Sequence, residues 1–414
     1  MTTSPASELL RQRSFVAYLS GVVLSQIGTR GAMAASLYQV YELSGSLATT
    51  GLVGAAGGLS LVVLSPIGGA LADRMDRRRL LQAAQTVGGL VALTLAVLTF
   101  TGAVRAWHVI LASLVSMAAT TFDNPTRQAL IGSMVPRHLL PQAFAMVNPA
   151  KEVAILVGPG LAGVLIAVGG PGLVHAVDAA TYAAMIAILA LVRAPSEHVG
   201  RDHPPILRAI GEGARYVTKR PIILLLMSLD LSAMVFGAYR VLLPAIALDV
   251  LHVGPTGYGL LAAAPSAGAV VATYGIVRVL GRSRRLGRVL LLATAAFAVA
   301  DIVLAQSRWF ALTLAAAVCL GVADALATSI RHAAVQLETP DELRGRVSSI
   351  YQMSSRGGPA IGDAVVGAVA SVLGPALALT LGAGLTLSYV TAMLARPNRV
   401  RSYAGPQCEE VAAR

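Results

Sequence analysis

Residues 68–79 read Gly-Gly-Ala-Leu-Ala-Asp-Arg-Met-Asp-Arg-Arg-Arg and separate one long apolar run from the next. A cluster of arginines between two membrane-length segments belongs on the cytoplasmic side, because positively charged loops are retained there. The two glycines at its start allow a pair of helices to pack closely. This loop therefore predicts a protein that crosses the membrane several times and indicates which of its loops face inward.

The composition of the whole chain favours the same class. Of 414 residues, 56% are hydrophobic and 13% are charged, with a mean hydropathy of +0.71. A soluble protein of this size carries about 25% charged residues. The net charge of +12 does not indicate nucleic acid, because the arginines lie between apolar runs. The two cysteines offer no metal-ligand spacing, so we expect neither a metal nor a cofactor.

Twelve apolar segments can span a bilayer, and helices satisfy their backbone hydrogen bonds in lipid. With both termini in the cytoplasm, the outward loops hold only Arg105 and Arg308, as the bias of basic residues toward inward loops requires. The expected fold is an all-α membrane protein. The predicted spans lie near residues 14–41, 46–72, 80–101, 107–134, 139–168, 172–193, 221–250, 256–280, 287–305, 308–336, 341–373 and 376–395.

The second half of the chain repeats the first. Thr50-Gly51 recurs 206 residues later, whereas Arg127, Gly158 and Gly163 recur 204 residues later as Arg331, Gly362 and Gly367. Two parallel six-helix units are typical of transporters, with a substrate site near mid-membrane. The predicted organisation is an N-terminal segment (1–13), a first bundle (14–194), a cytoplasmic linker (195–220), a second bundle (221–396) and a cytoplasmic tail (397–414). Residues 205–219 could form a surface helix, but a tether is the preferred interpretation.

Several motifs resemble those of the major facilitator superfamily. Gly69-x-x-x-Asp73-Arg74-x-x-Arg77-Arg78 is similar to its signature loop, although Asp76 replaces the usual glycine. The segments 41–46, 125–130 and 344–347 resemble the transmembrane secretion effector branch, which contains drug and siderophore exporters. Gly158-Pro159 followed by Gly163 resembles a helix 5 motif of exporting antiporters.

The resemblance implies a secondary active exporter of small amphipathic molecules that works by alternating access and proton antiport. It implies a multi-pass monomer in the bacterial inner membrane, whose partners are the substrate, protons and lipid, without nucleic acid. The mid-helix 4 arginine of many antiporters is missing, which leaves the proton relay open. An importer or facilitator is the alternative, followed by a membrane sensor or enzyme. Neither a nucleophile motif nor an ATP-binding loop is present, so we expect no enzyme activity.

The expected gate lies at the cytoplasmic ends of the helices. By resemblance, Asp73 lies beside the start of helix 11, where Thr339-Pro340-Asp341-Glu342 predicts a capping box with proline at the first helical position. The helix dipole would stabilise this contact by about 0.3–1 kcal/mol. Asp123 and Arg127 can pair four residues apart near water at the inner helix end, with Arg77 or Arg78 as further partners. A loop that only sets the topology is the alternative.

Polar residues at mid-membrane depth are the candidates for substrate and proton binding. Glu152 lies about 18 Å into its helix and shares a face with Asn148, and their repeats are Arg356 and Gln352. Ionisable groups at this depth are functional by default, although a charge cluster that braces packing is the alternative. Asp324 could pair with Arg30 or Asp230, and His175 and Asp178 are expected to be packing residues. The predicted cavity comprises Gln26, Arg30, Asn148, Glu152, Asp230, Gln352 and Arg356.

Overall fold

The computed structural model describes residues 5–74, 76–191, 206–282 and 285–404, and in these ranges it consists of helices joined by short turns. Side chains within the ranges are described except those of residues 5–7, 61–62, 65–74, 77, 124–125, 129, 206–210, 274, 277–278 and 280–282. The all-α prediction is confirmed.

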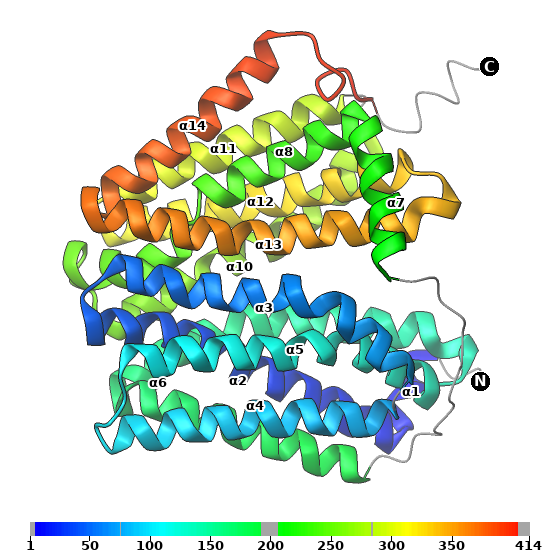
Figure 1. Cartoon of the computed structure of the whole chain (residues 1–414), viewed down its shortest axis with the longest axis vertical. Coiled ribbons are helices and arrows are strands. Elements are labelled where there is room, and N and C mark those ends of the chain that lie inside the picture. Colours follow the sequence, from blue (N-terminus) through cyan, green and yellow to red (C-terminus); the bar gives the residue numbers. More distant parts are fainter. Residues whose placement is uncertain (1–4, 75, 192–205, 283–284, 405–414) are drawn as a thin grey trace. The chain divides into compact units, whose positions relative to one another are not determined.

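The first half of the chain forms long antiparallel helices (Figure 1). One of them, α6, covers two predicted spans and is broken between them at Gly169 and Gly170, where Gly170 adopts a φ of 72°. Glycine reaches this left-handed region without the steric cost of a Cβ. The elements are α1 (Pro5–Arg11), α2 (Arg13–Ser44), α3 (Leu47–Arg74), α4 (Arg77–Phe100), α5 (Ala106–Met134), the 3₁₀ turn η1 (Arg137–Leu139) and α6 (Leu140–Leu191).

The second half repeats this pattern with one interruption. The helix that begins at Pro221 ends at Phe236, and the chain continues through short irregular turns to Val250. The elements are α7 (Ile206–Lys219), α8 (Pro221–Phe236), η2 (Tyr239–Leu242), α9 (Leu243–Ala245), η3 (Ile246–Val250), α10 (Gly254–Arg282), α11 (Leu286–Gln306), α12 (Phe310–Leu337), α13 (Asp341–Leu373) and α14 (Pro375–Ala395).

Among the described residues, seven helical segments are long and apolar enough to cross a membrane by length and composition. One of the seven, residues 137–191, contains both spans of α6. The helices α2 and α13 are outside this set, although they have 32 and 33 residues. They also carry the predicted site residues Gln26, Arg30, Gln352 and Arg356, so polar side chains concentrate on the less apolar helices.

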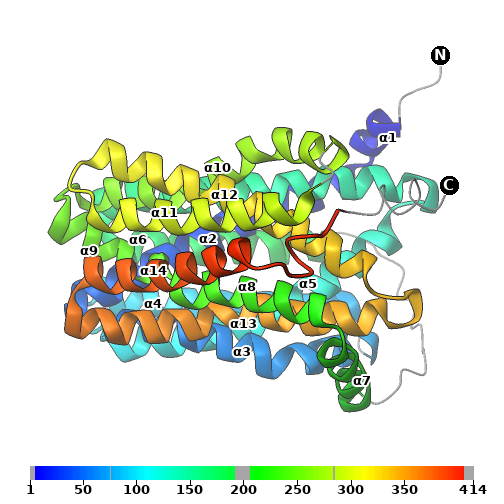
Figure 2. The same ribbon diagram turned by 90° about the horizontal axis from the view of Figure 1, so that it is seen from above.

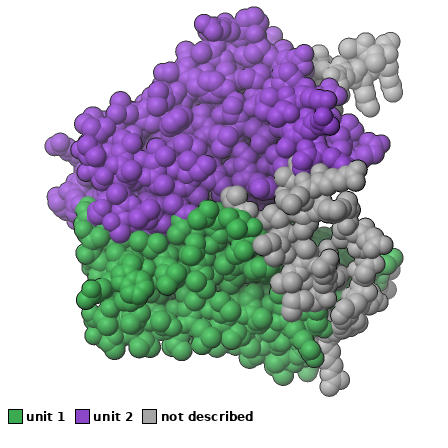
Figure 3. Space-filling view, viewed as in Figure 1, with its two compact units in different colours: residues 1–45, 56–202, 254–263 green, residues 46–55, 203–253, 264–414 purple. Residues whose placement is uncertain are grey.

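The chain divides into two compact units (Figure 3). Each unit contains one half of the repeat together with a short segment of the other half, residues 254–263 in unit 1 and residues 46–55 in unit 2. Unit 1 comprises residues 1–45, 56–202 and 254–263, and unit 2 comprises residues 46–55, 203–253 and 264–414.

Each unit has its own apolar core. In unit 1, buried Phe15, Leu81 and Val147 belong to a cluster that includes residues of α2, α4, α5 and α6. In unit 2, buried Leu226 and Leu291 belong to a cluster that includes residues of α8, α11, α12, α13 and α14, and α11 lies beside α12 (Figure 2). Large apolar side chains are also exposed on many helices, as expected where lipid replaces water.

The linker helix α7 packs across the start of α13 (Figure 1). Glu212 forms an ion pair with Arg346, and the Tyr216 hydroxyl donates to the Glu338 carbonyl at 3.0 Å. Val217 is buried in the core of unit 2. The sequence favoured a simple tether for residues 205–219, but the described part of this segment is a docked helix.

The segment after α14 folds back onto α11. The Gly287 amide donates to the Tyr403 carbonyl at 2.9 Å, and Val400 is fully buried. A Cβ at Gly287 would collide with the Val400 carbonyl, so this contact requires glycine. Residues 396–403 therefore supply a backbone acceptor to the first turn of α11, where amides have no partner within the helix.

Candidate functional site

A buried arginine organises a polar network in unit 1. The Nε of Arg127 lies 2.5 Å from Oδ2 of Asp123, which confirms the predicted pair. Their side chains are 1% and 3% exposed, so the pair is buried within unit 1. Gln85 donates to Asp123 at 2.8 Å, Ser25 donates to Gln85 at 3.3 Å and the Tyr18 hydroxyl donates to the Arg127 carbonyl at 3.3 Å. The network joins α2, α4 and α5.

The repeat of this arginine organises a second network in unit 2. The Nη2 of Arg331 lies 2.7 Å from Oδ1 of Asp230, and the two side chains are 1% and 2% exposed. Asp324 lies 3.9 Å from the same nitrogen, and Thr328 accepts a hydrogen bond from it at 2.9 Å. In the sequence, Arg331 stands out only as the repeat of Arg127. The 204-residue offset was the signal that could have identified it as the partner of Asp230.

Both networks contain an ion pair that is buried inside its unit. Removing one partner of a buried ion pair costs about 3–5 kcal/mol, because the remaining charge is left uncompensated. Arg127 and Arg331 each join helices of their own unit, which explains why arginine recurs at this position of the repeat. Asp230, predicted as a cavity residue, is covered by Arg331 and is much less accessible than the other candidates.

The remaining predicted cavity residues are more accessible. Asn148, Glu152 and Arg356 are exposed, whereas Gln26, Arg30 and Gln352 are partly buried on α2 and α13. The acid Glu152 and the base Arg356 thus occupy repeat-related positions and both have accessible side chains. Whether all seven residues line one cavity stays a prediction.

The described part of the signature loop forms the start of α4. The Asp76 carboxylate accepts a hydrogen bond from the Arg79 amide at 2.9 Å and is the N-cap of that helix. The aspartate that replaces the usual glycine therefore satisfies an amide that a helix start leaves free. Arg78 donates to the Ala190 carbonyl at 2.6 Å, at the end of α6. The side chains of Asp73 and Arg77 lie outside the described residues.

The start of helix 11 differs from the predicted capping box. Pro340 is the N-cap residue of α13 rather than its first helical residue, and it makes no side-chain capping bond. The Thr339 hydroxyl instead donates to the Val335 carbonyl at 2.6 Å. Asp341 pairs with Arg344 at 2.5 Å on the first turn. The prediction was wrong because α13 begins at Asp341, one residue later than the capping box requires, so Thr339 is not its N-cap residue.

The exporter motif of α6 is a set of close backbone contacts within unit 1. A Cβ at Gly158 would lie 2.7 Å from the Arg30 Cβ, so α2 and α6 approach each other there. A Cβ at Gly163 would lie 2.7 Å from both the Gly259 Cα and the Pro255 carbonyl oxygen of residues 254–263. Small residues allow helices to touch in this way inside membranes.

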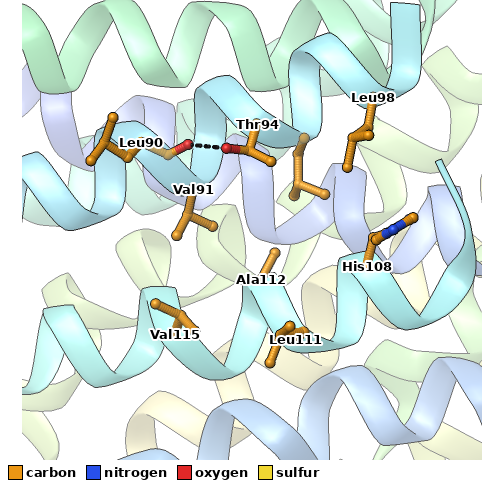
Figure 4. A pocket seen from close by; sticks show the side chains of 9 residues that line it. Leu90, Val91, Thr94, Leu98, His108, Leu111, Ala112 and Val115 are labelled. Atoms are coloured by element: carbon orange, nitrogen blue, oxygen red, sulfur yellow. Dashed lines mark hydrogen bonds between the residues drawn. The ribbon is translucent and has the colours of Figure 1, made fainter. Parts of the chain in front are cut away.

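A pocket of about 240 Å³ lies between α4 and α5 (Figure 4). Leu90, Leu98, Leu111 and Val115 line it, and the Thr94 hydroxyl is bonded to the Leu90 carbonyl at 2.7 Å. It includes none of the predicted site residues. Its apolar wall lacks the charges expected for the substrate site.

The repeated bundles and their buried charge pairs define a multi-pass membrane transporter of the major facilitator type. Solved structures share this fold. The nucleoside transporter NupG is 14% identical with a TM-score of 0.76, covering 93% of this chain and 99% of its own. A bacterial homologue of the iron transporter ferroportin is also 14% identical with a TM-score of 0.71, covering 92% of this chain and 97% of its own.

Within that class, a sequence profile described as transmembrane secretion effector matches residues 3–405, and the chain belongs to this family. The enterobactin exporter EntS of Citrobacter koseri is 28% identical over 366 residues, which cover 86% of this chain and 85% of that protein. EntS of Escherichia coli O1:K1 is 28% identical over 370 residues, with the same coverage. The predicted resemblance is confirmed, and the protein is a transporter rather than an enzyme.

Proposed function

We propose that this protein exports small amphipathic molecules, with siderophore-like chelators such as enterobactin as the leading substrate class and drugs as the second. The observation that carries the proposal is the similarity to enterobactin exporters along 86% of the chain. Export from the cytoplasm across a bacterial inner membrane, by a monomer with both termini inside, fits the arginine distribution and this similarity. An importer or facilitator is the alternative.

The accessible charges support a substrate that carries polar groups. Glu152 on α6 and Arg356 on α13 are both exposed, and Arg30 on α2 adds a second, partly buried positive charge. An arginine can bind an oxygen anion with two parallel hydrogen bonds, which suits a chelator with several oxygen ligands. The carboxylate of Glu152 would repel such an anion unless it were neutralised.

This repulsion suggests how export could be coupled to protons. Glu152 is the preferred carrier among the predicted carboxylates, because Arg331 holds Asp230 in a closed pair. Binding of the anionic substrate and a change in the protonation of Glu152 would then be linked in alternating access. Asp73, Arg77, Arg78, Asp123 and Arg127 remain the proposed gating residues.

Purified protein in liposomes tests the proposal. An imposed pH gradient should drive enterobactin against its concentration gradient, and dissipating the gradient should stop accumulation. Glu152→Gln should slow gradient-driven transport by about tenfold, equivalent to about 1.4 kcal/mol in the barrier. Asp249→Asn, near a predicted outer helix end, is the matched control and should transport normally. Transport that ignores the pH gradient would exclude antiport, and no movement of enterobactin would exclude this substrate.

A further inference from the structure

A carboxylate outside the predicted site residues lies in a helix contact of unit 2. Asp363 is on α13, ten residues before the end of that helix at Leu373, and is partly buried. Acidic side chains within a membrane span are costly, and those that occur usually have a function. Arg331 compensates Asp230, but the surroundings of Asp363 are different.

The carboxylate of Asp363 packs against glycine. Residues 46–55 of α3 lie along α13 in unit 2, and we call this contact the glycine seam, formed by Gly51, Gly54 and Gly367. A Cβ at Gly54 would overlap the Asp363 carboxylate, and one at Gly367 would lie 2.7 Å from the Leu47 carbonyl oxygen. Amides inside a helix are committed to its own carbonyls. The part of α3 that contacts the Asp363 carboxylate therefore offers it few hydrogen-bond donors.

The repeat shows that an acid is unnecessary for this geometry. Asp363 follows Gly362 and precedes Gly367, as Pro159 follows Gly158 and precedes Gly163. In unit 1, the Pro159 carbonyl faces Gly259, and the contact is made by backbone and small residues. The carboxylate in unit 2 therefore adds a chemical property that its counterpart lacks.

The charged groups on the elements around Asp363 come from η2, α12, α13 and α8. Arg240 on η2 attracts the Asp363 carboxylate electrostatically. Asp324 on α12 attracts the same arginine. On α13 itself, Arg356 lies seven residues earlier, two helical turns away. Asp230 on α8 is held by Arg331. Neither residues 46–55 nor α14 contains Asp, Glu, Lys, Arg or His, and Tyr389 of α14 is bonded to Ser228 at 2.7 Å.

We propose that Asp363 is a proton-binding site that controls the glycine seam. A proton from water binds the carboxylate and makes it neutral, and the neutral acid fits against Gly54. Loss of that proton to water leaves an anion, which is stabilised by Arg240 and by hydration and disfavours the closed seam. The proposal adds to the proposed antiport a specific carboxylate and the contact that it controls.

Distance measurements across the seam test this proposal without substrate. Spin labels at Leu52→Cys and Val372→Cys, 51% and 82% exposed, would report on the separation of residues 46–55 from α13 in a C319S/C408S background. Spectra in lipid nanodiscs would be recorded between about pH 5 and pH 9, a range that includes strongly perturbed carboxyl groups. The short-distance population should rise as the pH falls. In D363N the short-distance population should be high at every pH.

Two further variants keep the test decisive. R240Q removes the charge that favours the anion, so the transition should move upward by about one pH unit or more. E152Q should retain the parent's transition, which separates the seam from the proposed substrate site. A parent whose distances ignore pH, or a D363N or R240Q protein that follows the parent, would overturn the proposal. Failure of enterobactin transport would leave this result unaffected and would count only against the proposed function.

Discussion

The contact between α6 and residues 254–263 in unit 1 and the glycine seam in unit 2 occupy equivalent places in the repeat. In both, glycines let two helix backbones touch, as at Gly163 with Gly259 and at Gly367 with Gly51. The first has Pro159 where the second has Asp363. Backbone geometry has thus been retained while the chemistry has diverged. We infer that the shared part serves helix packing and that the differing residue can give the two contacts different responses to pH.

The largest expected difference is between the stability effects of removing an ion-paired carboxylate, Asp230, and of removing the carboxylate in the seam, Asp363. D230N leaves the buried guanidinium of Arg331 uncompensated and should lower the free energy of unfolding by about 3–5 kcal/mol. D363N removes no close ion pair found among the described residues and should change it by less than about 0.5 kcal/mol. Unfolding by dodecyl sulfate in mixed micelles measures both values. Equal losses would show that Asp363 is also a structural charge.

The next largest effect should come from filling either contact. G163A and G367A each place a Cβ against backbone atoms of the neighbouring helix and should cost about 1–3 kcal/mol in unfolding free energy. G384A on α14 meets open space and is the matched control. G163A and G367A should both unfold at a lower temperature and export substrate more slowly than the parent protein. A tolerated alanine at one site only would mean that the two backbone contacts are not equivalent.

The smallest effect concerns a second difference between the units. The start of α4 is capped by the Asp76 side chain, whereas Arg285 at the N-cap of α11 makes no side-chain capping bond. D76A should therefore cost about 1 kcal/mol. R285A should leave the capping of α11 unchanged, because the Tyr403 carbonyl accepts from Gly287. Unfolding curves of the two variants would make the comparison, and an equal loss would argue against the asymmetry.

The sequence was sufficient for the fold because lipid leaves few alternatives to helices and because the repeat is visible in Gly, Pro and Arg positions. It also predicted the Asp123–Arg127 pair, since both residues lie on one helix four positions apart. It did not identify the Asp230–Arg331 pair, whose members lie on α8 and α12 and meet only through tertiary packing. Local patterns do not specify such contacts.

Asp363 was missed for a related reason. Its importance lies in what faces it, and a glycine such as Gly54 gives no chemical signal of its own in the sequence. The capping box predicted at residues 339–342 was wrong because α13 begins at Asp341, with Pro340 as its N-cap residue. The roles of the exposed residues Glu152 and Arg356 remain predictions, because accessibility alone does not identify a ligand.

The contact between residues 396–403 and α11 has a consequence for biosynthesis. Helices are inserted into the membrane in the order in which they are translated, but the amide of Gly287 acquires its acceptor only when Tyr403 is made. More than 100 residues, including α12, α13 and α14, must therefore leave the ribosome before the first turn of α11 is complete. Premature termination after α14 would leave every predicted span intact and still release a protein with an unfinished helix start.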